Sequence, residues 1–140
     1  MENIPDTYVN EPIRYSALEV VDLAAEAAAV TEPYRNSVIS KVNKSCLRLA
    51  VFNQEYQWHR HPGSDELFIV VEGCLVIDLE DGKVLRLLPW QSVTIPAGMI
   101  HRTRAEGRTV NLCFEDLGAE TVFVDAPKQE NEAARRIVDD

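Results

Sequence analysis

Apolar and polar residues alternate in short runs from Ser37 onward, and turn residues separate these runs. Alternation with a period of two is typical of strands that bury one face. Asp81-Gly82 is the clearest of the breaks, because this dipeptide favours a two-residue hairpin loop. The pattern predicts strands at residues 37–42, 46–52, 54–61, 66–71, 74–79, 83–88, 92–95, 100–104, 108–114 and 121–124.

Many short strands at this spacing predict an all-β fold, either a sandwich or a barrel. A chain of 140 residues is long enough to bury a substantial core in one domain. We expect the barrel to span residues 37–126, with an N-terminal arm and short helix at 1–36 and a charged tail at 127–140. Residues 133–137 of that tail could form a further helix. No internal repeat is present, so one barrel is expected.

The segment before the strands has a different period. Apolar residues recur at three- and four-residue spacing between Leu18 and Ala28, which predicts a short helix that Ser16 would cap. Glu32 would end this helix, because a residue that precedes a proline is driven out of the helical region.

Charge and composition exclude several classes of protein. The net charge of -9 and the pI near 4.8 argue against binding to nucleic acid, which requires a basic face. The N-terminus lacks the basic start and apolar run of a signal peptide, and no apolar stretch approaches the length of a membrane span. The three cysteines are odd in number and sit in apolar runs, which is typical of buried, reduced thiols. We therefore expect a cytoplasmic protein.

The candidate chemistry lies in two short segments that contain all three histidines of the chain. His59 and His61 are two residues apart and would project from one face of a strand. Residues 62–65 form a predicted tight reversal, after which Glu66 opens the next strand. His101 follows a second turn that begins at Pro96.

Three imidazoles and one carboxylate suit a divalent transition metal, because nitrogen ligands favour such metals over Mg²⁺ or Ca²⁺. Four protein ligands leave open positions on a metal that prefers five or six, as a catalytic site requires. The alternative is that these histidines are surface-turn residues and Glu66 merely begins a strand. The combination of a spaced acid with a third histidine argues against that alternative.

The two segments resemble the paired motifs of the cupin family. His59-x-His61-x4-Glu66-x6-Gly73 resembles the first motif, and Pro96-x-Gly98-x2-His101 resembles the second. The resemblance extends over about residues 46–115 and implies a jelly-roll barrel with a metal inside. It also implies that the metal ligands are His59, His61, Glu66 and His101.

Three positions depart from the family pattern. The glycine that usually opens the first motif falls on Asn53, a residue type that tolerates a left-handed turn. The glycine that opens the second motif falls on Trp90, and the asparagine that closes it falls on Ala105. None of these positions is a ligand, so the site is expected to survive. The turn before Ser92 is the part that the resemblance does not support.

Three residues are candidates for contact with a small molecule, because each shares a strand face with a ligand: Gln57, Phe68 and Thr103. Small-molecule pockets are generally apolar with few polar groups, which fits this set. Phe52 and Phe114 could close the far end of the pocket, but ordinary core packing is the preferred interpretation for both. No second carboxylate is clearly placed as a general base near the metal, and no basic residue is expected to face inward.

The family resemblance implies a metal-dependent enzyme such as a dioxygenase, an isomerase or a lyase, with one Fe, Mn, Ni or Zn ion per chain. The alternative is a non-catalytic protein that binds a metal or a small ligand. A phosphosugar isomerase is less favoured, because phosphate normally requires an arginine or lysine in the pocket. No protein nucleophile is expected to take part.

We also expect a homodimer. Residues 67–71 are apolar on both faces of their strand, so the outward face needs a cover. The short helix near Leu23 can cover only part of it. Exposed apolar strand surface commonly marks a subunit contact.

Overall fold

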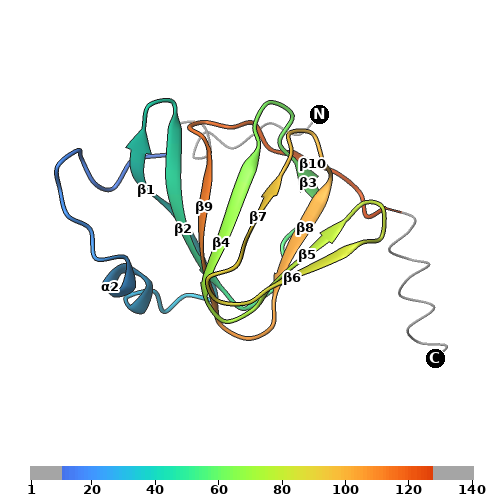
Figure 1. The fold of residues 1–140 in the computed structure, drawn as a ribbon, viewed down its shortest axis with the longest axis horizontal. Coiled ribbons are helices and arrows are strands. Elements are labelled where there is room, and N and C mark those ends of the chain that lie inside the picture. Colours follow the sequence, from blue (N-terminus) through green and yellow to red (C-terminus); the bar gives the residue numbers. More distant parts are fainter. Residues whose placement is uncertain (1–10, 128–140) are drawn as a thin grey trace.

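The computed structural model describes residues 11–127, and the predictions for residues 1–10 and for a helix at 133–137 lie outside this range. The strands form two five-stranded antiparallel sheets. Figure 1 shows these sheets as the two walls of a jelly-roll barrel. The first sheet has the order β1 (Tyr34–Val42), β2 (Ser45–Phe52), β9 (Thr109–Asp116), β4 (Glu66–Glu72) and β7 (Ser92–Ile95). The second has the order β10 (Val122–Phe123), β3 (His59–Arg60), β8 (His101–Ala105), β5 (Leu75–Leu79) and β6 (Val84–Leu87). This confirms the predicted all-β barrel.

The main core lies between the two sheets. Phe52 and Phe68 project into it from the first sheet, and Leu75 and Ile77 project into it from the second. Each of these side chains is at most 5% exposed. Burial of such side chains stabilises a fold by roughly 1.5–3 kcal/mol each, so this interior holds the barrel together.

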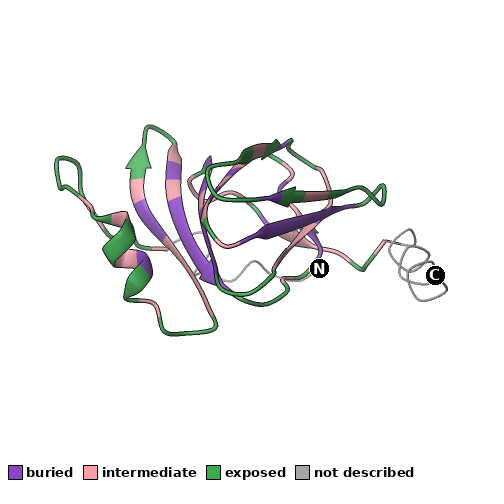
Figure 2. Cartoon of the chain, turned by 60° about the horizontal axis from the view of Figure 1, so that its bottom comes forward, coloured by how far each residue is buried: buried purple, intermediate pink, exposed green. Residues whose placement is uncertain are grey.

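A second apolar cluster covers part of the outer face of the first sheet. The helix α2 (Leu23–Ala28) packs Ala27 against Leu49, Val51 and Val110. Figure 2 shows that α2 buries little of its own surface, and its remaining face is exposed. The first sheet is therefore apolar on both faces, as the run at 67–71 predicted. The helix covers only part of the outer face.

The helix begins later than predicted. Its N-cap is Asp22, whose carboxylate accepts a hydrogen bond from the Ala25 amide at 3.0 Å, so the prediction of a Ser16 cap was wrong. The Ser16 amide instead donates to the Glu19 carboxylate in a separate turn. Leu18 has a φ of 74°, which a right-handed helix cannot include.

The strand prediction fails clearly at one place. Residues 54–58 are not a strand, apart from a single bridge between Glu55 and Arg104, and β3 is only two residues long. The Tyr56 amide donates to the Thr103 carbonyl at 2.9 Å, and the Ala105 amide donates to Gln54 at 3.3 Å. These irregular bonds tie the segment to β8 without the regular alternation of a strand.

The turn before Ser92 forms despite the lost glycine. Trp90 has a φ of 70°, in the left-handed region that a glycine would occupy, and its amide donates to the Val70 carbonyl at 2.7 Å. The predicted Asp81-Gly82 hairpin is also present, with Gly82 at a φ of 89°.

Among residues 11–127, the only helix is far too short to cross a membrane.

Candidate metal centre

The four predicted ligands come from both sheets and meet between them. His59 lies on β3 and pairs in register with His101, the first residue of β8. His61 follows β3 directly, and Glu66 is the first residue of β4 in the opposite sheet. All four are buried, and the four atoms that could bind a metal lie within 4.8 Å of one another. The nitrogens Nε2 of His61 and of His101 each lie 3.2 Å from Glu66 Oε1.

The three imidazoles are all held in the same tautomer. Nδ1 donates to the Gln57 carbonyl at 2.8 Å in His59, to the Glu120 carbonyl at 3.1 Å in His61, and to the Met99 carbonyl at 2.9 Å in His101. A carbonyl oxygen can only accept, so each Nδ1 carries a hydrogen, and each Nε2 has a free lone pair whenever its imidazole is neutral. Second-shell bonds of this kind orient metal-binding histidines in proteins.

The residues present therefore fit a metal. Nε2 of His61 is buried beside Glu66 Oε1 at 3.2 Å but makes no well-aligned hydrogen bond, which is costly for a polar atom unless another partner binds it. Neutral imidazole nitrogens together with a carboxylate are the donor set of a first-row transition metal. The residues that would hold it are those that the sequence predicted.

The two loops that carry these ligands are locked to each other. The Gly98 amide donates to the His61 carbonyl at 2.9 Å, and the Ala97 amide donates to Asp65 Oδ1 at 2.8 Å. Ser64 accepts a hydrogen bond from the Asp116 amide at 3.0 Å, which ties the first loop to β9. The polar turn residues between the motif positions thus fix where His61 and His101 lie.

The pKa values of His59, His61 and Glu66 are shifted in different directions and by different causes. Burial and the neighbouring His101 lower the pKa of His59 to about 4. Burial alone would lower the pKa of His61, but interactions with Glu66 outweigh it and raise the pKa. Burial alone would raise the pKa of Glu66, but His101 and His61 outweigh it and hold that pKa well below its ordinary value. Glu66 is therefore ionised at neutral pH, as a metal ligand must be.

Sequence reasoning missed a second buried carboxylate. Glu115 on β9 points inward, and its Oε2 lies 3.9 Å from Nε2 of His61. Burial and the charge of Glu66 raise the pKa of Glu115 to about 7. The expectation that no second carboxylate lies near the site was wrong.

A buried arginine accompanies this carboxylate, so the expectation that no basic residue faces inward was also wrong. Arg48 on β2 is 4% exposed, and its Nε lies 2.7 Å from Glu115 Oε1. It also contacts Glu11 at 3.0 Å and Asn36 at 3.2 Å. The alternation of β2 placed Arg48 on one face with Ala50, and that face proves to be the inner one.

The three cysteines are free and buried, as predicted. Cys113 lies next to the candidate metal ligands, which its apolar run did not indicate. Its thiol donates a hydrogen bond to Glu66 Oε2 at 3.1 Å. Burial and the nearby Glu66 raise the pKa of this thiol well above its ordinary value, which makes it a poor nucleophile.

The predicted small-molecule contacts lie in different environments. Phe68 is buried, with its ring edge-on to His101 at a centroid distance of 6.2 Å. Thr103 is half-buried on β8 and pairs with the core residue Ile77. Gln57 is exposed, because it precedes β3 rather than continuing it. The inference that placed Gln57 on the face of His59 was therefore wrong, whereas contact of these residues with a ligand stays a prediction.

Aromatic residues enclose the other side of the site. Tyr34 and Tyr56 stack at 5.7 Å, and Tyr56 meets His59 edge-on at 5.2 Å. Phe52 packs against Tyr34 in the core, which confirms core packing as its role. Phe114 instead is half-buried and lines a surface groove with Leu67 and Thr94, so core packing was the wrong interpretation for it, and it does not close the pocket either.

Comparison with known proteins agrees with this geometry. Residues 50–115 match the model of the Cupin domain family. The chain is 53% identical over 104 residues to the uncharacterized protein YdbB of Bacillus subtilis, an alignment that covers 74% of this chain and 92% of that protein.

Two crystal structures share the fold. A cupin-2 domain containing protein of Shewanella frigidimarina is 27% identical with a TM-score of 0.65, covering 69% of this chain and 94% of that one. Protein NMB1881 of Neisseria meningitidis is 26% identical with a TM-score of 0.64, covering 70% of this chain and 99% of that one. Both structural alignments cover nearly the whole of the other protein's chain.

Proposed function

The chain belongs to the cupin family, and we propose that it holds one divalent transition metal in the barrel and uses it to transform a small organic molecule. The observation that supports this most is the shared orientation of the three histidines. Each Nδ1 is bound to a backbone carbonyl, so three Nε2 lone pairs converge on Glu66. Buried lone pairs arranged in this way serve no packing purpose.

The metal would be Fe, Mn, Ni or Zn, held by His59, His61, Glu66 and His101. When bound, such a metal supplies Lewis-acid or redox chemistry to a nearby molecule. The chain's own residues hold the imidazoles in one tautomer and exclude water through the aromatic cluster around Tyr56. Phe68 and Thr103 would contact the molecule from within the barrel, and Gln57 from its exposed position.

The interior charge favours a neutral molecule over a phosphate ester. Among residues 11–127, Arg48 is the only buried arginine or lysine, but Glu115 and Glu11 both lie within 3.0 Å of its guanidinium. Glu66 adds a further negative charge. A phosphate would need a cation that is not already neutralised, so the phosphosugar isomerase interpretation gains no support from Arg48.

Within this proposal, a dioxygenase, an isomerase and a lyase each fit the same ligands, because function depends on the site and its ligand rather than on the fold. The alternative from another class is a non-catalytic protein that binds a metal or a small ligand. Turnover separates the two classes.

The test uses the purified full-length chain, loaded separately with Fe²⁺, Mn²⁺, Ni²⁺ and Zn²⁺. Oxygen uptake and product formation are measured across a panel of neutral small molecules, with a chelated sample as control. We expect turnover with at least one metal and none after chelation. Ligand binding without turnover would favour the binding protein, and turnover that survives complete metal removal would contradict the proposal.

A further inference from the structure

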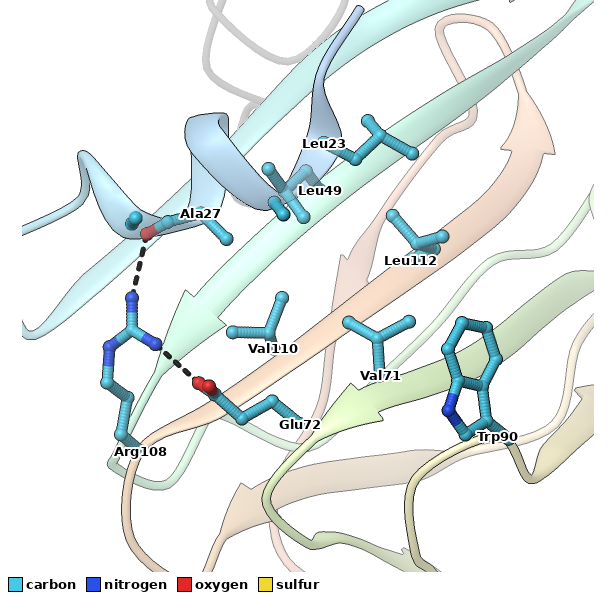
Figure 3. Close-up of a pocket in the computed structure, with 11 residues that line it drawn as sticks. Leu23, Ala27, Leu49, Val71, Glu72, Trp90, Arg108, Val110 and Leu112 are labelled. Atoms are coloured by element: carbon cyan, nitrogen blue, oxygen red, sulfur yellow. Dashed lines mark hydrogen bonds and ion pairs between the residues drawn. The ribbon is translucent and has the colours of Figure 1, made fainter.

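One carboxylate inside the barrel has an oxygen without a partner. Glu115 is 7% exposed, and within residues 11–127 its Oε2 makes no hydrogen bond. Charged groups elsewhere are better satisfied. In Figure 3, which shows the apolar groove beside α2, Arg108 reaches both the Glu72 carboxylate and the Ala27 carbonyl. A buried carboxylate oxygen without a hydrogen bond is costly, so this atom indicates a place for a ligand.

Two further ligand-type side chains lie beside this oxygen. Cys113 and Glu115 are two residues apart on β9 and therefore project from the same face of that strand. Glu66 begins β4, one residue before the pair of Leu67 and Phe114 that aligns β4 with β9. This register brings the three side chains together. All three are buried, and their ligand atoms lie within 4.8 Å of one another.

The oxygens of the two carboxylates face different groups. Oε1 of Glu66 lies 3.2 Å from Nε2 of two of the imidazoles, whereas its Oε2 accepts a hydrogen bond from the Cys113 thiol at 3.1 Å. In Glu115, Oε1 lies 2.7 Å from Arg48 Nε, and Oε2 is the atom without a hydrogen bond. Each carboxylate therefore has one oxygen available to a further cation.

We propose that Glu66, Cys113 and Glu115 form a second cation site beside the imidazole site, and that this site takes a thiophilic divalent metal such as Zn²⁺, Co²⁺ or Cd²⁺. The inference rests on the proposed metal centre, because Glu66 is shared between the two sites, and it adds a second ion to that centre. When the metal binds, the S–H bond of Cys113 breaks, the sulfur binds the metal, and the proton leaves to solvent.

The donor atoms suit such an ion. A thiolate selects soft or borderline metals, whereas Mg²⁺ and Ca²⁺ require more oxygen ligands than two carboxylates provide. Bond lengths of about 2.3 Å to sulfur and about 2.1 Å to oxygen would place these two atoms about 3.6 Å apart at a tetrahedral angle. The Cys113 thiol and Glu66 Oε2 are already 3.1 Å apart, so a small movement would accommodate the metal. A cation would also separate two carboxylates that repel each other across neighbouring strands.

The second site should fill after the first. It contains no imidazole, its thiol must lose a proton, and the guanidinium of Arg48 beside Glu115 repels a further cation. The chain as purified is therefore expected to hold the first metal alone, with the second site filling when more metal is added.

The test is an anaerobic titration of the full-length chain with Co²⁺, after removal of any bound metal by a chelator. Co²⁺ held by imidazoles and a carboxylate absorbs weakly in the visible range, whereas a thiolate bound to Co²⁺ adds an intense charge-transfer band in the near ultraviolet. The absorbance therefore reports the two sites separately and requires no knowledge of the substrate.

Two variants of similar shape probe the second site, Cys113→Ser and Glu115→Gln. Cys74→Ser is the matched control, because Cys74 is also a buried free cysteine but its sulfur contacts Arg86 at 3.7 Å instead of the carboxylates. Circular dichroism verifies that each variant is folded.

For the wild type and for Cys74→Ser, we expect a first equivalent of Co²⁺ without the charge-transfer band and a second equivalent with it. Cys113→Ser should lose the band, and Glu115→Gln should weaken the second equivalent by roughly tenfold or more, since even an outer partner of a metal commonly contributes about 10–100-fold in affinity.

Three results would overturn the inference and leave the proposed function in place: a single equivalent without the band, a band that appears with the first equivalent, or a band that survives in Cys113→Ser. A wild-type chain that binds no Co²⁺ at all would overturn both the inference and the proposed metal centre.

Discussion

At the scale of single residues, the turn that follows β4 depends on one glycine of the first motif. Gly73 has a φ of 85°, and an added Cβ would lie 2.4 Å from the Arg108 carbonyl oxygen and 2.6 Å from the Thr109 hydroxyl. Contacts this close cannot be relieved by rotating a side chain, since the first involves the backbone. The motif glycine is therefore a requirement of packing rather than of chemistry.

We predict that Gly73→Ala destabilises the fold by more than the roughly 1–2 kcal/mol that a left-handed backbone alone costs. Gly107→Ala is the matched control, because Gly107 has a φ of 79° with nothing within 4 Å of the added Cβ. Urea unfolding of both variants gives the comparison. Equal destabilisation of the two would show that the close approach at Gly73 has no energetic weight.

The grouping of the ligands was accessible to sequence analysis, whereas their buried neighbours were not. His59, His61 and Glu66 flank a short turn, so local geometry alone brings them together. Glu115 and Arg48 meet across β2 and β9, two strands far apart in the chain. Alternation shows which residues of a single strand share a face. It cannot tell which of the two faces is inside when both carry apolar residues.

At the scale of elements, the pair of Arg48 and Glu115 joins β2 to β9 in the interior. We predict that Arg48→Met lowers the free energy of unfolding by about 3–5 kcal/mol, because it leaves a carboxylate buried without its cation. The double variant Arg48→Met with Glu115→Leu should recover most of this loss, since the buried carboxylate is removed together with its cation, and the Glu11 carboxylate that also loses a partner is part-exposed. Chemical denaturation of both variants provides the measurement.

Arg35→Met serves as the control for that series. Arg35 pairs with Glu32 at 3.7 Å on the surface, and an exposed ion pair contributes about 0–1 kcal/mol. A loss in Arg48→Met no larger than in Arg35→Met would mean that the interior pair does not hold β2 and β9 together.

A second charged group joins β5 to β8 on the outside of the second sheet. Asp78 accepts hydrogen bonds from Arg102 at 2.9 Å and from Arg104 at 2.9 Å, and Arg102 also stacks on the Trp58 ring. Burial alone would raise the pKa of Asp78, but hydrogen bonds from Arg104 and Arg102 outweigh it and lower the pKa. A lowered carboxyl pKa contributes stability that is present above the unfolded-state value and is lost as pH falls through the folded-state value.

We therefore predict that Asp78→Asn is less stable than the wild type near neutral pH, and that the difference shrinks as the pH falls below about 4, the ordinary range for an aspartate. Urea unfolding over a series of pH values measures this, with Glu80→Gln as an exposed control. A difference that stays constant down to acid pH would assign the effect to packing instead of charge.

The elements themselves were predicted well wherever alternation was regular. The strands at 46–52, 66–71 and 92–95 match β2, β4 and β7 to within a residue. The strand prediction failed at residues 54–58 because only isolated hydrogen bonds join that segment to β8. Side chains two residues apart therefore need not share a face there, and Gln57 does not point the same way as His59. The helix begins at Leu23, because the carboxylate cap of Asp22 prevails over the weaker apolar spacing that extends back to Leu18.

At the scale of the whole molecule, the candidate metal centre joins the two walls of the barrel. Glu66 belongs to the first sheet, whereas His59 and His101 belong to the second. The core between the sheets is continuous without these four residues. A metal would therefore add to the stability of a barrel that folds on its own, and loss of one ligand should cost occupancy without unfolding the chain.

The central claim is tested most directly by elemental analysis of the full-length chain and of His61→Ala, purified in parallel. The controls are Glu66→Gln within the site and Glu55→Gln outside it, a matched pair of carboxylates of which only Glu66 faces the imidazoles. We predict about one transition metal per chain for the wild type and for Glu55→Gln, and a large loss of metal for His61→Ala and Glu66→Gln with the circular dichroism spectrum unchanged. Undiminished metal content in His61→Ala would contradict the account.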